Sequence, residues 1–208
     1  GVGKSVLLKC LIGLIKPDLG TIYIDNKLIN SMNFKQLQAI RSKIGMVFQF
    51  GALFDSLNVS ENISLALKKL TKLNKDEIRI RVDDSLKKVG MEKTEELMPS
   101  ELSGGMKKRI GIARAIALKP SYLFYDEPTT GLDPIMTDEI NRLINKFQKS
   151  GDVTSVIITH EMKTVNDVAD RVIMLNAGNI VYDGNSINLH ETNNVIVQQF
   201  ITGNSILI

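Results

Sequence analysis

Cysteine is nearly absent from this sequence of 208 residues, because Cys10 is the only one. One cysteine cannot form a disulfide within the chain, and no charged segment followed by an apolar one opens the sequence as in a secretory signal. Long apolar runs are also missing, since stretches such as residues 172–175 are far shorter than the roughly 20 residues of a membrane-spanning helix. These absences exclude a disulfide scaffold and a chain that crosses a bilayer alone, and they favour a reducing, cytosolic setting.

A strong excess of charge of one sign is absent as well. Lysine and arginine number 26 against 23 aspartate and glutamate, which gives a net charge of +3, and 43% of the residues are hydrophobic. This balance argues against a dedicated nucleic-acid binder, a disordered chain and a fibrous protein, so we expect no nucleic-acid partner. The length suits one large domain or two small ones, with a core that needs no disulfide or metal to hold it.

Apolar segments of helical period alternate with short β-branched runs, which predicts an α/β fold with a largely parallel sheet. The expected strands are residues 44–48, 121–125 and 154–159, and hairpins are expected at residues 21–27 and 171–182. The expected helices are residues 5–14, 59–70, 76–89, 107–118 and 137–149. Helical patterns follow one another without a strand between residues 58 and 103, so we predict a helical subdomain there, inserted into a core of residues 1–57 and 104–208.

The first residues match the end of the phosphate-binding pattern G-x-x-x-x-G-K-[ST], followed by an apolar helix. In this pattern glycines let backbone N–H groups surround phosphates, a lysine reaches the β and γ phosphates, and a serine hydroxyl binds Mg²⁺. The alternative is a glycine-rich turn before a helix. The candidate phosphate-binding residues are Gly1, Val2, Gly3, Lys4, Ser5 and Val6.

Two carboxylates end the apolar run of residues 121–125. Asp126 is the natural carboxylate for Mg²⁺, and Glu127, one position later, is suited to polarise a water for attack on the γ-phosphorus. The alternative is a pair of acids that cap the next helix. Together with the lysine–serine pair, these carboxylates predict the two halves of one Mg-nucleotide site.

A second anion-binding site, besides the predicted phosphate loop, is expected where a serine and two glycines precede a helix. An ordinary helix cap is the competing interpretation, because a serine before an amphipathic helix needs no ligand. Combined with the first site, this second site suggests that nucleotides are held between two subunits. Each subunit would offer its Gly-Lys-Ser element to one ATP and its Ser-Gly-Gly element to the other. The residues concerned are Leu102, Ser103, Gly104, Gly105 and Met106.

The order of these motifs resembles the nucleotide-binding subunit of an ABC transporter over essentially the whole chain. The resemblance implies a P-loop NTPase core with an antiparallel β edge, ATP and Mg²⁺ as ligands, and ATPase activity in a homodimer. It makes Gln49 the Q-loop glutamine, a catalytic residue and a further Mg²⁺ ligand, and Asp133 the D-loop residue at the dimer seam. It makes His160 the switch histidine that contacts the γ-phosphate, and residues 102–106 the signature that completes the partner's site.

Each of these last assignments has a plainer alternative. An isolated Gln49 is more simply a solvated residue after a strand, and an isolated His160 a hydrogen-bonded histidine at a strand-to-helix turn. Asp133 precedes a proline, so its carboxylate is also suited to begin a helix. For Asp133 both interpretations are compatible.

The resemblance also bears on the start of the sequence. The family places the first glycine of the phosphate loop, an aromatic residue that stacks on adenine and the N-terminal strands before the position of Gly1. We therefore expect an N-terminally truncated fragment that binds ATP less well than the complete chain.

Three stretches resemble one branch of the family, the ATPase subunit of the Mla (MCE-type) phospholipid transporter. They are residues 50–54 after Gln49, residues 97–101, and Met106 where most cassettes carry glutamine. This likeness implies phospholipid transport linked to outer-membrane lipid asymmetry, with two permease subunits, an MCE-domain protein and, in some systems, a STAS-domain partner. It places the chain at the cytoplasmic face of the inner membrane, bound peripherally through the permease.

Other functions share most of these motifs and remain open. An amino-acid or other polar-solute importer is the first alternative. A soluble ABC-type ATPase that acts on DNA or ribosomes is less favoured, because the sequence leaves no room for a coiled-coil insertion between the two halves of the site. A catalytically silent regulatory subunit conflicts with the presence of Asp126, Glu127 and His160.

Overall fold

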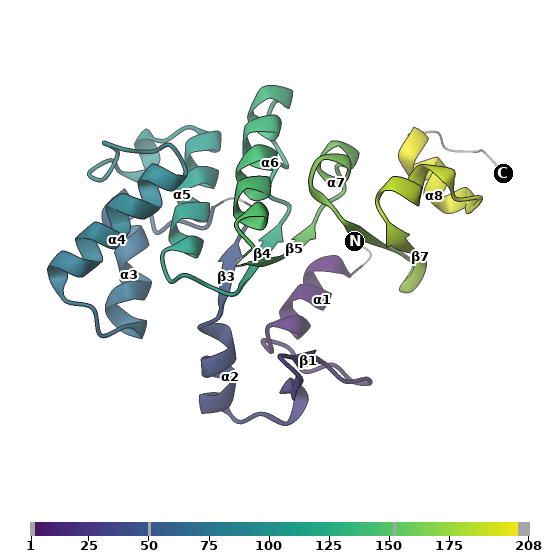
Figure 1. Ribbon diagram of the computed structural model, residues 1–208, viewed down its shortest axis with the longest axis horizontal. Helices are drawn as coiled ribbons and strands as arrows, with labels where there is room; N and C mark the ends of the chain where they lie inside the picture. The colour runs from purple at the N-terminus through teal and green to yellow at the C-terminus, as the bar shows by residue number, and fades with distance from the viewer. Residues whose placement is uncertain (1–2, 50, 152, 204–208) are drawn as a thin grey trace.

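A computed structural model describes residues 3–49, 51–151 and 153–203 (Figure 1). Its central sheet has three parallel strands in the order β3 (Ile44–Val47), β4 (Tyr122–Asp126) and β5 (Thr154–Ile158). Parallel neighbours need long crossovers, and helices supply them here. The crossover from β3 to β4 contains α3 (Val59–Leu70), α4 (Lys75–Lys88), the 3₁₀ turn η2 (Pro99–Glu101) and α5 (Gly104–Ile116), and the one from β4 to β5 contains α6 (Pro134–Lys149). The α/β class expected from the sequence is confirmed.

Both expected hairpins are present as antiparallel pairs. The first joins β1 (Tyr23–Ile24) to β2 (Lys27–Leu28), and the second joins β6 (Arg171–Asn176) to β7 (Asn179–Asn185). In the first turn Asp25 and Asn26 both have positive φ, at 50° and 58°, which is the backbone of a tight two-residue hairpin turn. The Asp25 carboxylate accepts hydrogen bonds from Tyr122 of β4 and from Lys43, so this hairpin is tied to the central sheet.

The predicted helix boundaries differ from the observed ones mainly at the ends. α1 (Lys4–Leu11) stops before residue 14, and Gly13 follows it in a left-handed conformation with φ of 68°. α5 begins at Gly104, three residues earlier than predicted, because Ser103 caps it. Short helices to which the sequence analysis assigned no range are α2 (Phe34–Arg41), α7 (Met162–Val168), α8 (Val195–Thr202), and the 3₁₀ turns η1 (Ile29–Ser31) and η3 (Ile187–Glu191).

Asparagine caps four of the described helices, and at three of them the cap is reciprocal. The side chains of Asn33, Asn58 and Asn74 each accept a hydrogen bond from the backbone N–H three residues on, and the side chain at that position accepts one from the asparagine N–H. These reciprocal bonds satisfy two backbone donors that the first helical turn leaves free. They fix where α2, α3 and α4 begin.

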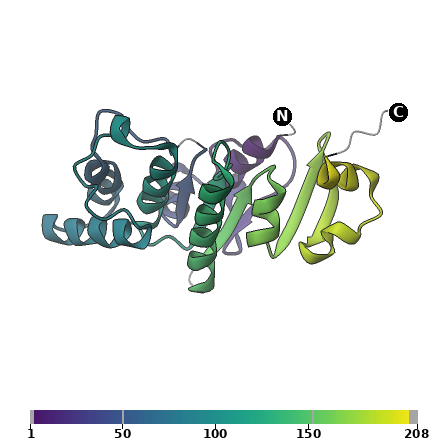
Figure 2. The same cartoon turned by 90° about the horizontal axis from the view of Figure 1, so that it is seen from above.

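The two faces of the sheet pack against different helices. Along β4, Leu123 and Tyr125 belong to the large core under α3 to α6, whereas Phe124 packs with Leu8 of α1 and Ile158 on the other face. This alternation follows from the two-residue period of a strand. Figure 2 shows α1 and α6 on opposite sides of the strands. Helix α1, which follows the predicted phosphate loop, is thereby held against one face, and α5, which begins at the predicted signature, against the other. No helix in the described ranges has the length and apolar character that would let it span a bilayer.

Helix α5 approaches β3 closely at Gly45. A Cβ atom at this position would lie 2.6 Å from the carbonyl oxygen of Ala115 and 2.7 Å from Leu123 Cδ2. We expect Gly45→Ala to lower the free energy of unfolding by about 1–3 kcal/mol, because backbone must move to make room. Urea unfolding measures this difference. Gly104→Ala is the control, since open space surrounds a Cβ there, and equal stability of the two variants would contradict the close approach.

Candidate nucleotide-binding site

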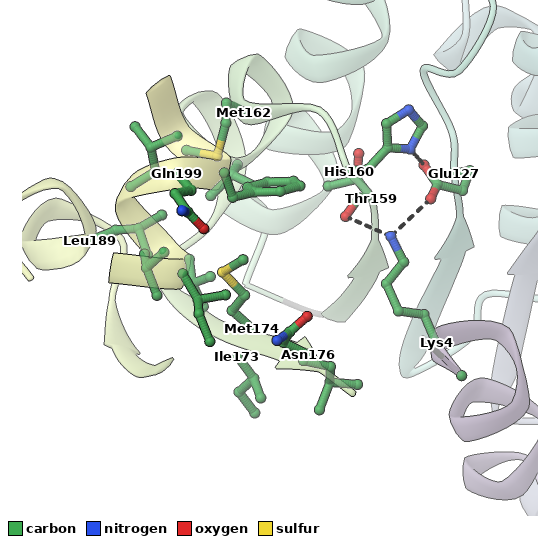
Figure 3. A pocket seen from close by; sticks show the side chains of 18 of the residues that line it. Lys4, Glu127, Thr159, His160, Met162, Ile173, Met174, Asn176, Leu189 and Gln199 are labelled. Atoms are coloured by element: carbon green, nitrogen blue, oxygen red, sulfur yellow. Dashed lines mark hydrogen bonds and ion pairs between the residues drawn. The ribbon is translucent and has the colours of Figure 1, made fainter. Parts of the chain in front are cut away.

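A cavity of about 1050 Å³ brings together most of the residues that the sequence singled out. Its polar half is lined by Gly3, Lys4, Ser5, Val6, Gln49, Glu127, Thr159 and His160, which come from four separate segments of the chain (Figure 3). These segments meet because α1 starts beside the carboxyl ends of β3, β4 and β5, the edge where open α/β sheets bind ligands. Gly1 and Val2 lie outside the described residues.

The other half of the cavity is apolar and has a different character. Side chains of β6, α7 and α8 line it, including Met162, Ile173 and Met174 (Figure 3). It lies between β6, whose residues line it, and Thr159 at the end of β5, and these two strands do not pair with each other in the described part of the chain. Unpaired strand edges present backbone N–H and C=O groups, which suit pairing with a further strand better than binding of a small ligand. The polar half is therefore the candidate site for a nucleotide.

The phosphate loop ends in a left-handed glycine. Gly3 has φ of 91° and forms the N-cap of α1, and its carbonyl accepts the first helical hydrogen bond, from Leu7 N–H at 2.9 Å. The N–H groups of the first turn therefore have no partner within the helix. Together with the helix dipole they make the start of α1 a favourable place for a phosphate.

The Lys4 ammonium reaches across to the ends of β4 and β5. Its Nζ donates to Glu127 Oε1 at 3.2 Å and to the carbonyl oxygen of Thr159 at 3.3 Å (Figure 3). The Lys4 side chain is 31% exposed and that of Glu127 is 14% exposed. Lys4 thus carries its charge into the cavity, where it is bonded to protein oxygens.

Glu127 is held from several directions. Its Oε2 lies 2.8 Å from His160 Nδ1 and accepts a hydrogen bond from the Thr130 hydroxyl at 3.0 Å. Its backbone is left-handed, with φ of 51°, a strained conformation for a residue with a side chain. Burial alone would raise the pKa of the Glu127 carboxyl, but the His160 hydrogen bond, the Lys4 charge and the Thr130 hydroxyl together lower it below its ordinary value. Glu127 is therefore ionised at neutral pH.

Ser5 and Asp126 are the residues that fit a magnesium ion. The Ser5 hydroxyl donates to Asp126 Oδ1 at 3.3 Å, so two hard oxygens from α1 and β4 lie side by side. No cluster of three or more His, Cys, Asp or Glu side chains suited to a metal occurs among the described residues. The pair suits Mg²⁺, which binds through one or two protein oxygens, substrate phosphates and water. Gln49 lines the same cavity, half-buried, after β3.

The signature residues lie apart from this cavity. Leu102 is buried, and the Ser103 hydroxyl accepts a hydrogen bond from Met106 N–H at 3.3 Å, so Ser103 is an N-cap whatever else it binds. Gly104 faces open space, whereas a Cβ on Gly105 would overlap the Met136 side chain. None of residues 102–106 lines the cavity that holds Lys4. The start of α5 therefore lies outside the cavity formed by the chain's own predicted phosphate loop.

Asp133 begins helix α6, as the plainer interpretation predicted. Its Oδ1 accepts hydrogen bonds from the N–H groups of Ile135 and Met136, both at 2.9 Å. Asp133 is exposed, and it does not line the cavity. Helix capping is therefore shown for Asp133, and its role at a dimer seam stays a prediction.

Two residues of the site were missed by the sequence analysis. Thr130 donates to the Glu127 carboxylate, and the Thr159 carbonyl accepts from Lys4. Thr130 stands only three residues after Glu127, so the reach of its hydroxyl was a signal in the sequence. Thr159 acts through its backbone, which carries no such signal.

Comparisons with known proteins agree on the family. The family model described as "ABC transporter" matches residues 1–130. A methionine import ATP-binding protein, MetN 2 of Bacillus cereus, is 44% identical over 88% of this chain and 54% of its own. The probable ribonucleotide transport ATP-binding protein mkl of Mycobacterium leprae is 40% identical over 99% of this chain and 59% of its own. The chain thus spans little more than half the length of these curated relatives.

Solved structures give the same result. CbiO1 from Clostridium perfringens, part of the ABC transporter complex cbiONQ, superposes with a TM-score of 0.84 at 36% identity, over 96% of this chain and 79% of its own. The dimeric post-hydrolysis state of the ATP-binding cassette MJ0796, bound to ADP and Pi, gives a TM-score of 0.81 at 33% identity, over 89% of this chain and 81% of its own. The chain belongs to the ABC transporter family and has the fold of its ATP-binding cassettes.

Proposed function

We propose that this chain is the ATP-binding and ATP-hydrolysing subunit of an ABC transporter. The observation that carries the proposal is the arrangement of Lys4, Glu127 and His160 around one cavity, with Ser5 and Asp126 paired beside it. A cation for phosphates, oxygens for Mg²⁺ and an ionised carboxylate are the parts that phosphoryl transfer to water needs.

Binding of ATP changes the partner of Lys4. In the structure Lys4 bonds Glu127 and Thr159, so the β and γ phosphates must attract its ammonium away from these oxygens. The loss of the Lys4 contact removes one cause of the lowered pKa of the Glu127 carboxyl. ATP thereby makes Glu127 a better base at the moment when a base is needed.

In the hydrolysis step we assign the proton to Glu127. Its carboxylate accepts a proton from the attacking water, whose oxygen bonds the γ-phosphorus as the bond to the leaving ADP oxygen breaks. His160 and Thr130 hold Oε2, which leaves Oε1 for the water once Lys4 has moved. Ser5 and Asp126, with Gln49 as the resemblance implies, would hold Mg²⁺, which offsets the phosphate charge.

A second copy of the chain is the proposed partner at the signature. The start of α5 at Ser103 and Gly104 is open and remote from the chain's own Lys4, as expected for a device that serves a neighbour's ATP. The similar cassette MJ0796 is described as dimeric, which supports a homodimer. Asp133 is proposed to lie at the seam between the copies.

We propose that residues 58–103 form the helical subdomain that contacts the permease, on a core of residues 1–57 and 104–208. The described part of this segment contains α3, α4 and η2 and no strand, and α5 packs against both helices and β3. Gln49, between β3 and this segment, would report nucleotide occupancy to it.

For the substrate we propose phospholipid, because residues 50–54, residues 97–101 and Met106 resemble the Mla branch. The partners would then be two permease subunits, an MCE-domain protein and, in some systems, a STAS-domain protein. The chain would lie at the cytoplasmic face of the inner membrane. A methionine or other polar-solute importer is the second candidate, and the 44% identity to a methionine import ATP-binding protein favours it.

Capture of the complex distinguishes the two substrates. The full-length protein carrying Glu127→Gln is expressed in its native host, membranes are solubilised gently, and mass spectrometry identifies the proteins and lipids that co-purify. We expect a permease, an MCE-domain protein and phospholipid. A solute-importer permease would replace the substrate assignment and keep the ABC assignment, whereas ribosomes or DNA-repair proteins would contradict transport itself.

A further inference from the structure

Lys108 is a buried cation that the site described above does not use. It lies on α5, five residues after Ser103, and only 5% of it is exposed. Its Nζ donates to the carbonyl oxygen of Thr130 at 2.7 Å and to that of Glu127 at 3.4 Å. Within the described ranges no carboxylate lies within 4.0 Å of this ammonium. A buried charge held by two carbonyl groups is costly, so its position calls for an explanation.

The two carbonyl groups belong to the loop that presents the Glu127 carboxylate. The N–H of Glu127 donates to the Ile158 carbonyl of β5 at 2.8 Å, and its C=O faces Lys108. Hydrogen bonds on both sides of Glu127 thus hold its left-handed backbone, with φ of 51°. At the other end of the loop Lys108 holds Thr130, whose hydroxyl bonds Glu127 Oε2. One ammonium therefore fixes both the backbone and a side-chain partner of Glu127.

The pKa of the Lys108 ammonium lies below its ordinary value. Burial lowers the pKa of the ammonium, while the carboxylates of Glu161 and Glu127 act in the opposite direction. Because Glu127 is among them, the cation also adds to the positive potential at the carboxylate. Lys108 is thus connected to Glu127 by geometry and by charge.

We propose that Lys108 is a positioning residue for ATP hydrolysis, which ties the helix that begins at the signature to the loop that carries Glu127. The inference rests on the proposed function. Because Ser103 caps α5, an ATP bound by the partner copy at that helix start lies about 1.4 helical turns along α5 from Lys108. Movement of α5 on closure of the dimer would reach Glu127 and Thr130 through this one side chain.

The test compares kcat with KM in the full-length protein. Lys108→Met removes the charge and the donors but keeps an unbranched side chain as far as Cε. We expect kcat to fall about 10- to 100-fold while the KM for ATP changes less than twofold, because Lys108 acts on Glu127 and not on the phosphates. Lys108→Arg, which retains charge and donors, should recover part of the rate. Lys119→Met, at an exposed lysine after the same helix, is the control and should match the wild type.

Each outcome is decisive for this inference. A kcat for Lys108→Met within twofold of the control, or a loss expressed only in KM, would overturn the positioning role. If Lys108→Met does not fold, Lys108→Gln takes its place, with a donor of shorter reach and the same expected split. A wild-type protein without ATPase activity would contradict the proposed function instead, so the two failures are distinguishable.

Discussion

Glu127→Gln is expected to lower the kcat of the full-length protein by about 100-fold or more and to leave ATP binding intact. The amide has nearly the size of the carboxylate and still accepts the Thr130 hydrogen bond through its oxygen, but it cannot take a proton from water. It also ends the ion pair with Lys4, so the lysine is free for phosphate before ATP arrives. Binding should therefore equal or exceed that of the wild type.

Steady-state phosphate release and equilibrium binding of a fluorescent ATP analogue measure the two effects. Glu92→Gln is the matched control, because Glu92 is exposed after α4 and does not line the cavity. Turnover of Glu127→Gln close to that of Glu92→Gln would remove Glu127 from the role of base. Loss of binding together with turnover would make Glu127 a structural residue of the loop.

The fold was predictable where a local pattern decides it. The parallel strands and the hairpins follow from β-branched runs and turn residues, although the left-handed turn residues of the first hairpin are Asp25 and Asn26, one position before the predicted turn at Asn26 and Lys27. α2 was missed although Asn33 and Gln36 form a reciprocal cap and Phe34, Leu37 and Ile40 recur at helical spacing, because this pattern lasts only eight residues and the cap sets where it begins. The early start of α5 was missed for a related reason, since two glycines there weaken helix propensity and the Ser103 cap decides the boundary.

The candidate site was predictable where its residues belong to distinctive sequence motifs. Lys4, Glu127 and His160 were expected together and lie within hydrogen-bond reach of one another through Glu127. The residues that position them were not expected, because Thr159 and Lys108 act through carbonyl groups that every residue possesses. Such partners depend on how α5, β4 and β5 pack, and tertiary packing has no local signature.

A single added charge at the predicted signature should test its role in ATP hydrolysis without disturbing the fold. We expect Gly104→Asp to abolish ATP hydrolysis while the fold is unchanged or slightly stabilised. Open space surrounds a Cβ at Gly104, and a carboxylate in the first turn of α5 interacts favourably with the helix dipole. The same carboxylate would repel the phosphates of an ATP presented by the partner copy. Gly104→Ala, which adds volume without charge, is the control and should lose less activity.

Mixing two inactive variants then shows which copy each signature serves. Lys4→Ala removes the phosphate cation of one site, and Gly104→Asp disables the signature. A heterodimer of the two has one site in which both elements are defective and one in which both are intact, if the signature acts on the partner's ATP. Random mixing should therefore restore about a quarter of the wild-type rate, since half of the dimers are mixed and each has one working site of two.

Phosphate release is measured for each variant alone and for the mixture after exchange of subunits. If each signature served the ATP of its own chain, every site in the mixture would carry one defect, and no activity would return. The observation that residues 102–106 do not line the cavity of Lys4 predicts the first result. Urea unfolding of Gly104→Asp belongs in the same experiment, because a variant as stable as the wild type, inactive alone and active in the mixture, places the lost interaction between the copies.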